Sequence, residues 1–306
     1  MYYFLISDHG GGGRAVRLFP KIEKMLKACG VQYTYWKSSS NHRAVEIVQE
    51  VCNSGDADAR FVVMGGDGTM NAVLNGISDF SALKLGLIPT GSGNDFARGL
   101  GVTKNYKKTL EKILSADGTK KIDIGQVTGP DGTKHIFGIS VGLGMDAIIG
   151  RKADEAPYKK FLNKLKLGKL IYLFAAIGTL AHLKCTDMKI RIDDGETRYL
   201  KKVFYLAFMN CRTEGGGIPM APSAKNDDGK LTVGVGVNVK PWMGFLVFPF
   251  ICLGLQNKFK YFTEITCNSL EVTCDEPQIC HYDGEALGTN ATLKVAVLPQ
   301  KLTVLV

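Results

Sequence analysis

The chain has 306 residues, of which 45% are hydrophobic and 22% are charged. This length and composition fit a folded protein of about two domains and exclude a disordered chain, a collagen or a coiled coil. The 38 lysines and arginines outnumber the 29 acidic residues, which gives a net charge of +9. A positive charge suits anionic partners such as nucleotide phosphates, anionic lipids or nucleic acid, and it does not choose among them.

The cysteines and the apolar segments indicate where the protein acts. Eight cysteines are too few for a disulfide scaffold, and none forms the Cys-x-x-Cys pair that zinc sites use. The N-terminus lacks the positive start of a signal peptide and favours a first strand. The segments 162–183 and 242–255 are interrupted by lysines or are too short for the ~20 apolar residues of a membrane span. We therefore expect reduced thiols and a cytoplasmic protein.

Short apolar runs alternate with helical patterns in the first part of the chain. The runs typical of strands are Tyr3–Ile6, Val31–Trp36, Arg60–Met64 and Leu85–Ile88. Apolar residues at helical spacing lie between them, from Phe19 to Cys29 and from Ala44 to Val51. This alternation predicts an open, mostly parallel α/β sheet whose ligands bind at the carboxyl ends of the strands.

The rhythm changes after Lys120, where β-type runs follow one another and Asp-Gly turn signals separate them. The runs include His135–Val141, Ser269–Cys274 and Ala291–Val297. They predict a mainly antiparallel β domain with helical insertions at roughly 143–183 and 241–256. The last run, Lys301–Val306, can return to the first domain. The expected domains are residues 1–124 completed by 298–306, and residues 125–297.

The sharpest motif is Gly65-Gly66-Asp67-Gly68-Thr69, which lies between a buried strand and a helix. Glycines permit a close approach of phosphate, and the start of a helix presents free N–H groups. Asp67 can hold Mg²⁺ directly or through water, and Thr69 can cap the helix or contact a phosphate. The motif indicates a phosphate cradle. The alternative is a tight turn in which Asp67 only binds backbone amides.

A second loop of this kind, Pro89–Arg98, follows the fourth strand and opens a helix. It brings two glycines, hydroxyls, an amide, a carboxylate and a guanidinium into one turn, which suits a triphosphate with its metal. The residues assigned to the nucleotide here are Thr90, Gly91, Ser92 and Arg98, with Asn71 from the helix after the first motif. Asp95 is assigned to the metal together with Asp67. The alternative is that Asn94 or Asp95 only caps a helix.

Together, Gly65–Asn71 and Pro89–Arg98 resemble the catalytic domain of diacylglycerol kinases and sphingosine kinases, in particular the soluble bacterial diacylglycerol kinase-like lipid kinases. The resemblance covers essentially the whole chain. It implies an α/β nucleotide-binding domain of NAD kinase or diacylglycerol kinase type, followed by a β-sandwich domain for a lipid substrate. It also implies ATP and Mg²⁺ as cofactors, a hydroxyl of diacylglycerol or a related lipid as the acceptor, and a place in phospholipid biosynthesis.

The family's third motif, Asp-Gly-Glu, is present as Asp283-Gly284-Glu285. A carboxylate suits removal of the acceptor's proton, because the loose transition state of phosphoryl transfer requires positioning more than a strong base. The resemblance implies that Asp283 is the general base and that Glu285 is its partner. An ordinary Asp-Gly turn is the alternative for the dipeptide alone.

The resemblance also implies a structural Mg²⁺ site and a first nucleotide loop. The metal site is implied at Asp228 and Lys230, although Lys225 stands where the family usually has a further ligand. The first loop departs from the family's Asn-Pro-x-Ser-Gly, but its glycines still admit a phosphate or ribose. The residues assigned to the nucleotide in this region are Gly10, Gly11, Gly12, Gly13, Arg14 and Ser39.

Two apolar segments bear on lipid binding. Lysines at 159–169 precede the run Leu170–Ile177, an order that suits an interfacial helix on the anionic inner face of a membrane. An interdomain helix is the alternative for this segment. The stretch Trp242–Leu255 suits an acyl-chain pocket or the core, and its lack of a polar face favours burial. The sequence leaves the oligomeric state open, a homodimer included.

Two other functions compete with a lipid kinase. An NAD kinase or another soluble alcohol kinase shares the Gly-Gly-Asp-Gly-Thr motif, but NAD kinases lack Asn94–Arg98 and the Asp-Gly-Glu turn in this form. A nucleotide-binding regulator without turnover is suggested by the altered first loop and opposed by the retained carboxylates. Nucleic acid is not an expected partner, because the sequence has no RNP, zinc-finger or recognition-helix pattern.

Overall fold

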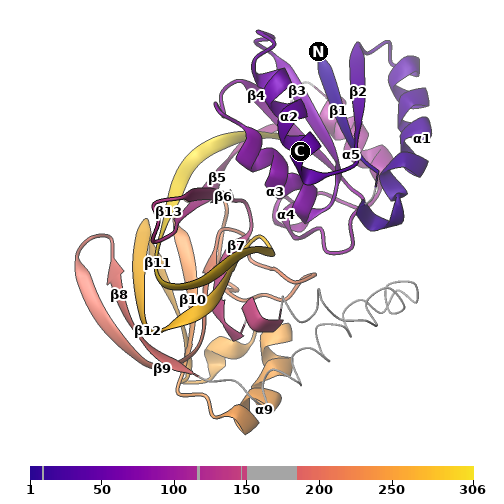
Figure 1. Ribbon diagram of the computed structural model, residues 1–306. Helices are drawn as coiled ribbons and strands as arrows, with labels where there is room; N and C mark the ends of the chain where they lie inside the picture. Colours follow the sequence, from indigo (N-terminus) through magenta and orange to yellow (C-terminus); the bar gives the residue numbers. More distant parts are fainter. Residues whose placement is uncertain (9, 116–117, 146, 150–184) are drawn as a thin grey trace. The chain divides into compact units, whose positions relative to one another are not determined.

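The computed structural model describes residues 1–306 except residue 9 and the ranges 116–117, 146 and 150–184 (Figure 1). The chain divides into two compact units, Met1–Ile124 with Pro299–Val306, and Gly125–Leu298. Strands β5 (Thr119–Thr128) and β13 (Glu285–Leu305) each contribute residues to both units. Most of the first predicted helical insertion, and the basic and apolar segment 159–177, lie outside the described residues.

The first unit is built on a parallel sheet. Its strands are β1 (Tyr2–Ser7), β2 (Tyr33–Ser38), β3 (Ala59–Gly65) and β4 (Leu83–Pro89). Their order is β4-β3-β1-β2, and the end of β13 joins next to β4, where Val304 pairs with Leu85. Because all these pairs are parallel, the loops after β1 to β4 leave the sheet at the same edge.

Helices cover both faces of this sheet. They are α1 (Arg14–Ala28), α2 (Asn41–Cys52), α3 (Asp67–Gly76), α4 (Asp95–Gly99) and α5 (Tyr106–Leu114). α1 and α5 pack with Phe4 and Val62 in one apolar cluster. Leu5 and Val63 point to the opposite face and are also buried, and α2 and α3 pack against each other and against β3. Apolar side chains of β1 and β3 are therefore buried on both faces of the sheet.

Local signals explain where the helices begin. The side chain of Ser40 accepts a hydrogen bond from the Arg43 N–H at 3.1 Å at the start of α2. Asn105 accepts in the same way from the Lys107 N–H at 3.1 Å at the start of α5. Such side-chain caps satisfy N–H groups that have no partner within the helix.

The second unit is antiparallel. Its strands include β6 (Lys134–Phe137), β7 (Ser140–Gly144), β8 (Thr186–Ile192), β9 (Glu196–Met209), β10 (Leu231–Val237), β11 (Phe262–Cys267) and β12 (Ser269–Tyr282). The order β11-β10-β9-β7-β12 forms the main path, and β12 also pairs with β8 and β13. The α/β domain followed by an antiparallel β domain confirms the predicted fold class.

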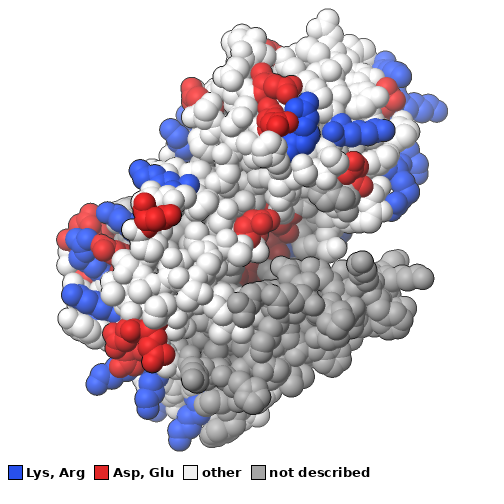
Figure 2. Space-filling view, in the orientation of Figure 1, with Lys and Arg blue, Asp and Glu red and all other residues white. Residues whose placement is uncertain are grey.

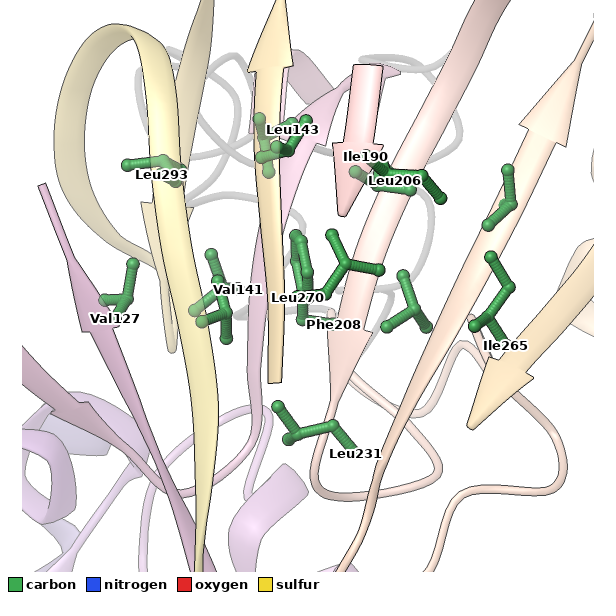
Figure 3. Packing of buried hydrophobic residues seen from close by; sticks show 14 of the residues in the cluster. Val127, Val141, Leu143, Ile190, Leu206, Phe208, Leu231, Ile265, Leu270 and Leu293 are labelled. Atoms are coloured by element: carbon green, nitrogen blue, oxygen red, sulfur yellow. The ribbon is translucent and has the colours of Figure 1, made fainter. Parts of the chain in front are cut away.

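An apolar cluster fills the second unit (Figure 3). Val141 and Leu143 of β7 and Leu206 and Phe208 of β9 belong to it, as the alternation of side chains along a strand requires. The thiol of Cys280 is also buried there, and burial raises its pKa to about 12. This cysteine is therefore a neutral thiol at neutral pH.

The second predicted helical segment contains α9 (Pro241–Cys252) and a 3₁₀ turn, Gln256–Lys258. The expected burial of this stretch is wrong for one side of α9, where Leu246 is 62% exposed. A helix that is apolar all round has no polar face by which the sequence could show its solvent side. No helix of the described residues is long and apolar enough to cross a membrane.

One face of the described residues shows how their charges are distributed. On the face that Figure 2 shows, acidic and basic side chains are interspersed over the described residues, and no broad basic patch gathers the net charge. A broad basic patch is the electrostatic footprint of nucleic-acid binding. This face therefore lacks that footprint.

Candidate functional site

Three glycine-containing loops meet at the carboxyl ends of β1, β3 and β4. A Cβ atom on Gly11 would lie 2.1 Å from the carbonyl oxygen of Thr90, and one on Gly91 would lie 2.5 Å from Gly66 Cα. The Thr90 N–H donates to the carbonyl oxygen of Gly65 at 2.9 Å. No side chain fits at these close approaches, so the loops form a cradle whose wall is backbone. We call these three loops, 10–13, 65–66 and 90–91, the glycine cradle.

Two features of the glycine cradle fit phosphate. α3 begins at Asp67, directly after Gly66, so its first N–H groups have no acceptor within the helix. The hydroxyl of Thr90 is buried, and its oxygen has no hydrogen-bond partner among the described residues. A buried hydroxyl without a protein partner is rare in folded proteins and fits a contact with a ligand oxygen. Thr69 is buried against Gly65, where a Cβ atom would lie 2.7 Å from its own.

Of the two carboxylates assigned to Mg²⁺, Asp67 joins the first motif to the second loop, and Asp95 is bonded within the second loop. Asp67 Oδ1 accepts a hydrogen bond from the Phe96 N–H at 3.1 Å. Asp95 is buried and forms an ion pair with Arg98, which also donates to the carbonyl oxygen of Gly93 at 3.1 Å. The described residues contain no group of three or more His, Cys, Asp or Glu that could hold a metal. Mg²⁺ is usually held by one or two carboxylates and substrate phosphates, so these residues fit the ion together with a nucleotide.

Asn94 fixes the loop before α4. Its backbone is left-handed, with φ of 56°. Its side-chain oxygen accepts from the Gly91 N–H at 3.0 Å, and its side-chain nitrogen donates to the carbonyl oxygen of Gly91 at 2.7 Å. Asn94 therefore holds the peptide groups of Gly91 at the glycine cradle, a role that the sequence analysis did not assign. Ser92 and Arg98 are exposed.

The first loop is held by an arginine that the sequence analysis missed. Arg17, which is exposed like the assigned Arg14, donates to the carbonyl oxygen of Gly12 at 2.7 Å. Gly11, Gly12 and Gly13 all have positive φ. The sequence does contain a signal for this contact, because Arg17 lies one helical turn after Gly13.

The remaining assigned nucleotide residues lie near these loops. Ser39 is exposed between β2 and α2, and the Asp8 N–H donates to the carbonyl oxygen of the preceding Ser38 at 3.1 Å. Gly68 lies in the first turn of α3. Asn71 is buried in α3, and its carbonyl oxygen accepts from the Asn75 side chain at 2.9 Å.

Asp283 is anchored by backbone amides in the second unit. Its carboxylate accepts from Gly138 N–H at 2.8 Å through Oδ2, and from the N–H groups of Ile139 at 2.8 Å and Ser140 at 3.0 Å through Oδ1. Its own N–H donates to the carbonyl oxygen of Ser140 at 2.9 Å. These bonds also explain why the predicted strand His135–Val141 is two strands, since the three N–H groups bond to Asp283 instead of a neighbouring strand.

Glu285 and an aromatic pair flank this anchor. Glu285 starts β13 and lies opposite Tyr282 in the pairing of β12 with β13. The ring of His135 stacks on that of Tyr282 with centroids 4.6 Å apart. Burial, and then the charges of Glu285 and Asp283, raise the pKa of the Tyr282 hydroxyl. Tyr282 is therefore a neutral hydroxyl at neutral pH.

A buried carboxylate that the sequence analysis did not single out belongs to the same network. Glu214 is 6% exposed and accepts a hydrogen bond from the Ser140 hydroxyl. Ser140 is bonded to Asp283 through both its N–H and its carbonyl oxygen. Glu214 is thus linked to Asp283 through a single residue, Ser140. Its position directly before the three glycines 215–217 is the signal that could have drawn attention to it.

The implied structural Mg²⁺ site lies on an exposed turn. The Lys230 N–H donates to Asp228 Oδ1 at 3.1 Å, and Lys230 Nζ donates to the Asn268 side-chain oxygen at 2.8 Å. Lys225 is exposed. Among the residues described, no third acidic, histidine or cysteine ligand joins Asp228. Metal binding at Asp228 and Lys230 stays a prediction.

Comparison with known protein families shows to which family this chain belongs. Residues 1–127 match the diacylglycerol kinase catalytic domain, and residues 139–306 match the YegS C-terminal NAD kinase beta sandwich-like domain. This chain belongs to the diacylglycerol kinase family. The resemblance seen in its motifs is thereby confirmed, and membership supports a lipid kinase.

Individual relatives share the whole architecture. A diacylglycerol kinase of Mycobacterium tuberculosis (strain ATCC 25618 / H37Rv) is 26% identical over 278 residues, which are 86% of each chain. The crystal structure of a diacylglycerol kinase from Bacillus anthracis str. Sterne has a TM-score of 0.72 at 20% identity and covers 99% of this chain and 96% of its own. An NAD kinase from Archaeoglobus fulgidus in complex with ATP has a TM-score of 0.55 at 13% identity, covering 100% and 94%. At these identities the two structures show the fold of this diacylglycerol kinase family member.

Proposed function

We propose that the protein is an ATP- and Mg²⁺-dependent lipid kinase that transfers the γ-phosphoryl group to a hydroxyl of diacylglycerol or a related lipid. The glycine cradle with the buried Thr90 hydroxyl is the observation that carries the phosphate half of this proposal. The diacylglycerol kinase family supplies the lipid half. The Archaeoglobus fulgidus NAD kinase was solved with ATP, which supports the choice of nucleotide.

The glycine cradle binds and orients the nucleotide in this mechanism. The N–H groups at the start of α3 and the Thr90 hydroxyl donate to phosphate oxygens, and Asn94 keeps the Gly91 peptide in place. Asp67 and Asp95 would hold Mg²⁺, which neutralises charge on the phosphates. Arg98, already paired with Asp95, adds a positive charge next to that carboxylate.

Asp283 would receive the proton of the lipid hydroxyl. As the new bond from the lipid oxygen to the γ-phosphorus forms, the bond to the leaving β-phosphate oxygen breaks and the hydroxyl proton moves to the carboxylate. The three amide donors fix the orientation of Asp283 and stabilise its charge. It therefore acts through its position more than through high basicity, which suits a loose transition state.

An assay with a panel of acceptors tests this function. The purified protein is incubated with γ-labelled ATP and mixed micelles that contain diacylglycerol, monoacylglycerol, ceramide or sphingosine, and separately with NAD. We expect label in a lipid, loss of labelling with EDTA and recovery with Mg²⁺. Label in NAD alone would identify an NAD kinase, and ATP binding without any labelling would identify a regulator. Asp67→Asn should lower turnover by ~10², whereas Asp79→Asn, an exposed carboxylate of the same unit, should not.

The contact of Glu214 with Ser140 gives a second prediction. Glu214→Ala removes the acceptor of the Ser140 hydroxyl and loosens the segment whose amides hold Asp283. We expect kcat to fall by roughly tenfold with the KM for ATP unchanged, because the glycine cradle lies in the other unit. Glu214→Gln keeps an acceptor oxygen and should restore most of the activity.

Asp227→Asn is the matched control, since it changes an exposed acidic side chain of the same unit. Thermal unfolding is followed for all three variants, and kinetics are measured well below each midpoint. A Glu214→Ala enzyme with parental kcat, or with kcat and the KM for ATP changed together, would contradict a positioning role for Glu214.

A further inference from the structure

Helix α9 presents an apolar face to solvent. The exposed residues on and next to it are Phe245, Leu246, Pro249, Phe250, Cys252 and Leu253. With 3.6 residues per turn, these positions lie on one side of the helix. The opposite side, Val247, Phe248 and Ile251, is buried in an apolar cluster of the second unit. We call the exposed side the α9 face.

The α9 face differs from the other exposed apolar residues of the described chain. The remaining large ones, Met1, Tyr35 and Tyr199, lie on separate elements, whereas Leu246 and Leu253 are 62% and 70% exposed next to exposed phenylalanines. Single exposed apolar residues are ordinary in folded proteins. A contiguous group of them marks a surface that binds a partner.

Lysines stand at both ends of the α9 face. No charged residue occurs from Pro241 to Asn257, whereas Lys240 precedes this stretch and Lys258 and Lys260 follow it, all three exposed. Cationic side chains beside an apolar surface match a partner that is apolar inside and anionic outside. A bilayer with anionic headgroups has this chemistry.

The length of α9 decides how it can meet a bilayer. The helix has 12 residues, which falls short of the ~20 apolar residues of a span. Its buried side holds it against the second unit, so only the α9 face is available to acyl chains. Such a helix lies in the plane of the interface.

We propose that the α9 face docks the protein on anionic membranes, with its leucines and phenylalanines among the acyl chains and the flanking lysines at the headgroup phosphates. This surface consists of other residues than the segment 159–177, on which the sequence analysis placed a membrane contact and which lies outside the described residues. The proposal rests on the lipid kinase function only in that a diacylglycerol substrate resides in a bilayer. The surface itself is argued from its own residues.

Vesicle sedimentation tests the proposal on the full chain. Vesicles contain phosphatidylcholine with or without phosphatidylglycerol. The double variant Leu246→Gln and Leu253→Gln should bind anionic vesicles at least about tenfold more weakly than the parent, because each substitution removes an apolar side chain from the interface. Tyr199→Gln is the matched control, since Tyr199 is 74% exposed elsewhere in the same unit, and it should bind like the parent.

Salt dependence tests the lysines separately. The triple variant Lys240→Gln, Lys258→Gln and Lys260→Gln should bind severalfold more weakly at low salt, and this difference should shrink at high salt because ions screen the attraction. Binding that is equal for parent and triple variant at low salt would contradict the role of these lysines.

Other occupants of the α9 face give different results. A parent that is dimeric without lipid, and monomeric in the double variant, would show that a second copy covers the face and would overturn the proposal. Hydrogen exchange in α9 that is slow without vesicles and unchanged by them would show that another part of this chain covers it, with the same consequence. Equal vesicle binding by parent and double variant would also overturn it.

Different results would contradict the proposed docking surface and the proposed kinase function. The double variant should phosphorylate detergent-dispersed diacylglycerol at the parental rate, because its changes lie outside the glycine cradle and the Asp283 network. A parent that binds vesicles through the α9 face and phosphorylates no lipid would overturn the proposed function alone. A kinase active in detergent whose vesicle binding ignores Leu246 and Leu253 would overturn the docking surface alone.

Discussion

Replacing Asp283 by asparagine is expected to lower lipid phosphorylation by roughly 10²–10⁴ while ATP affinity stays near that of the parent. The carboxylate would no longer accept the acceptor's proton, whereas the glycine cradle lies in the other unit. Asparagine also presents a donor to amides that now donate to Asp283, so unfolding should become easier by about 1–3 kcal/mol. Equilibrium ATP binding, initial rates and thermal unfolding of the same preparations measure the three effects.

Ser140→Ala separates the chemical role of Asp283 from its structural role. This variant removes the hydroxyl that bonds Glu214 and keeps the Ser140 N–H that donates to Asp283. It disturbs the same network with the carboxylate in place, so its rate should fall by no more than about tenfold. If both variants lose activity to the same extent for the same loss of stability, Asp283 is a turn residue and its assignment as the base is wrong.

The fold was predictable where burial leaves a mark on the sequence. β1, β3 and β4 are apolar runs because helices cover both faces of a parallel sheet, and their boundaries were predicted within a few residues. Residues 275–290 form the end of β12, the turn and the start of β13, and they are mostly exposed or half-buried. Neither a continuous apolar run nor strict alternation marks them, so the long hairpin was predicted as two short strands.

The site was predictable where its residues are close in the chain. Phosphate loops are local, since a strand end, glycines and a helix start suffice to define them. The anchor of Asp283 is not local, because the N–H of Gly138 lies 145 residues before it, and Glu214 lies 74 residues after Ser140. Nothing in the neighbourhood of either carboxylate in the sequence encodes such contacts. The α9 face was not predicted for another reason. Where a helix is apolar on all sides, the residue types do not show which side of the helix will be buried.

The geometry of the glycine cradle gives the second large effect. Gly91→Ala places a Cβ atom 2.5 Å from Gly66 Cα and 3.1 Å from Asn94 Oδ1, so the backbone of one loop must move. Gly91 does not have a positive φ, so the clash alone causes the change. A shift of about 1 Å at such a site costs ~10² or more, and we expect ATP affinity and kcat to fall together. Calorimetric ATP titration and the lipid assay measure both quantities.

Gly12→Asn is the control that makes this result specific to the contact between Gly66 and Gly91. A Cβ atom at Gly12 meets nothing within 4 Å, and asparagine tolerates its φ of +66° better than other side chains. The two substitutions add side chains to loops at the same sheet edge, but only Gly91→Ala fills the space where the loops touch. If Gly91→Ala binds ATP like the parent, or Gly12→Asn loses as much affinity, the contact between Gly66 and Gly91 does not shape the phosphate site and the nucleotide must bind elsewhere. Loss in Gly91→Ala alone would link phosphate binding to the close approach of Gly66 and Gly91, in the loops that follow β3 and β4.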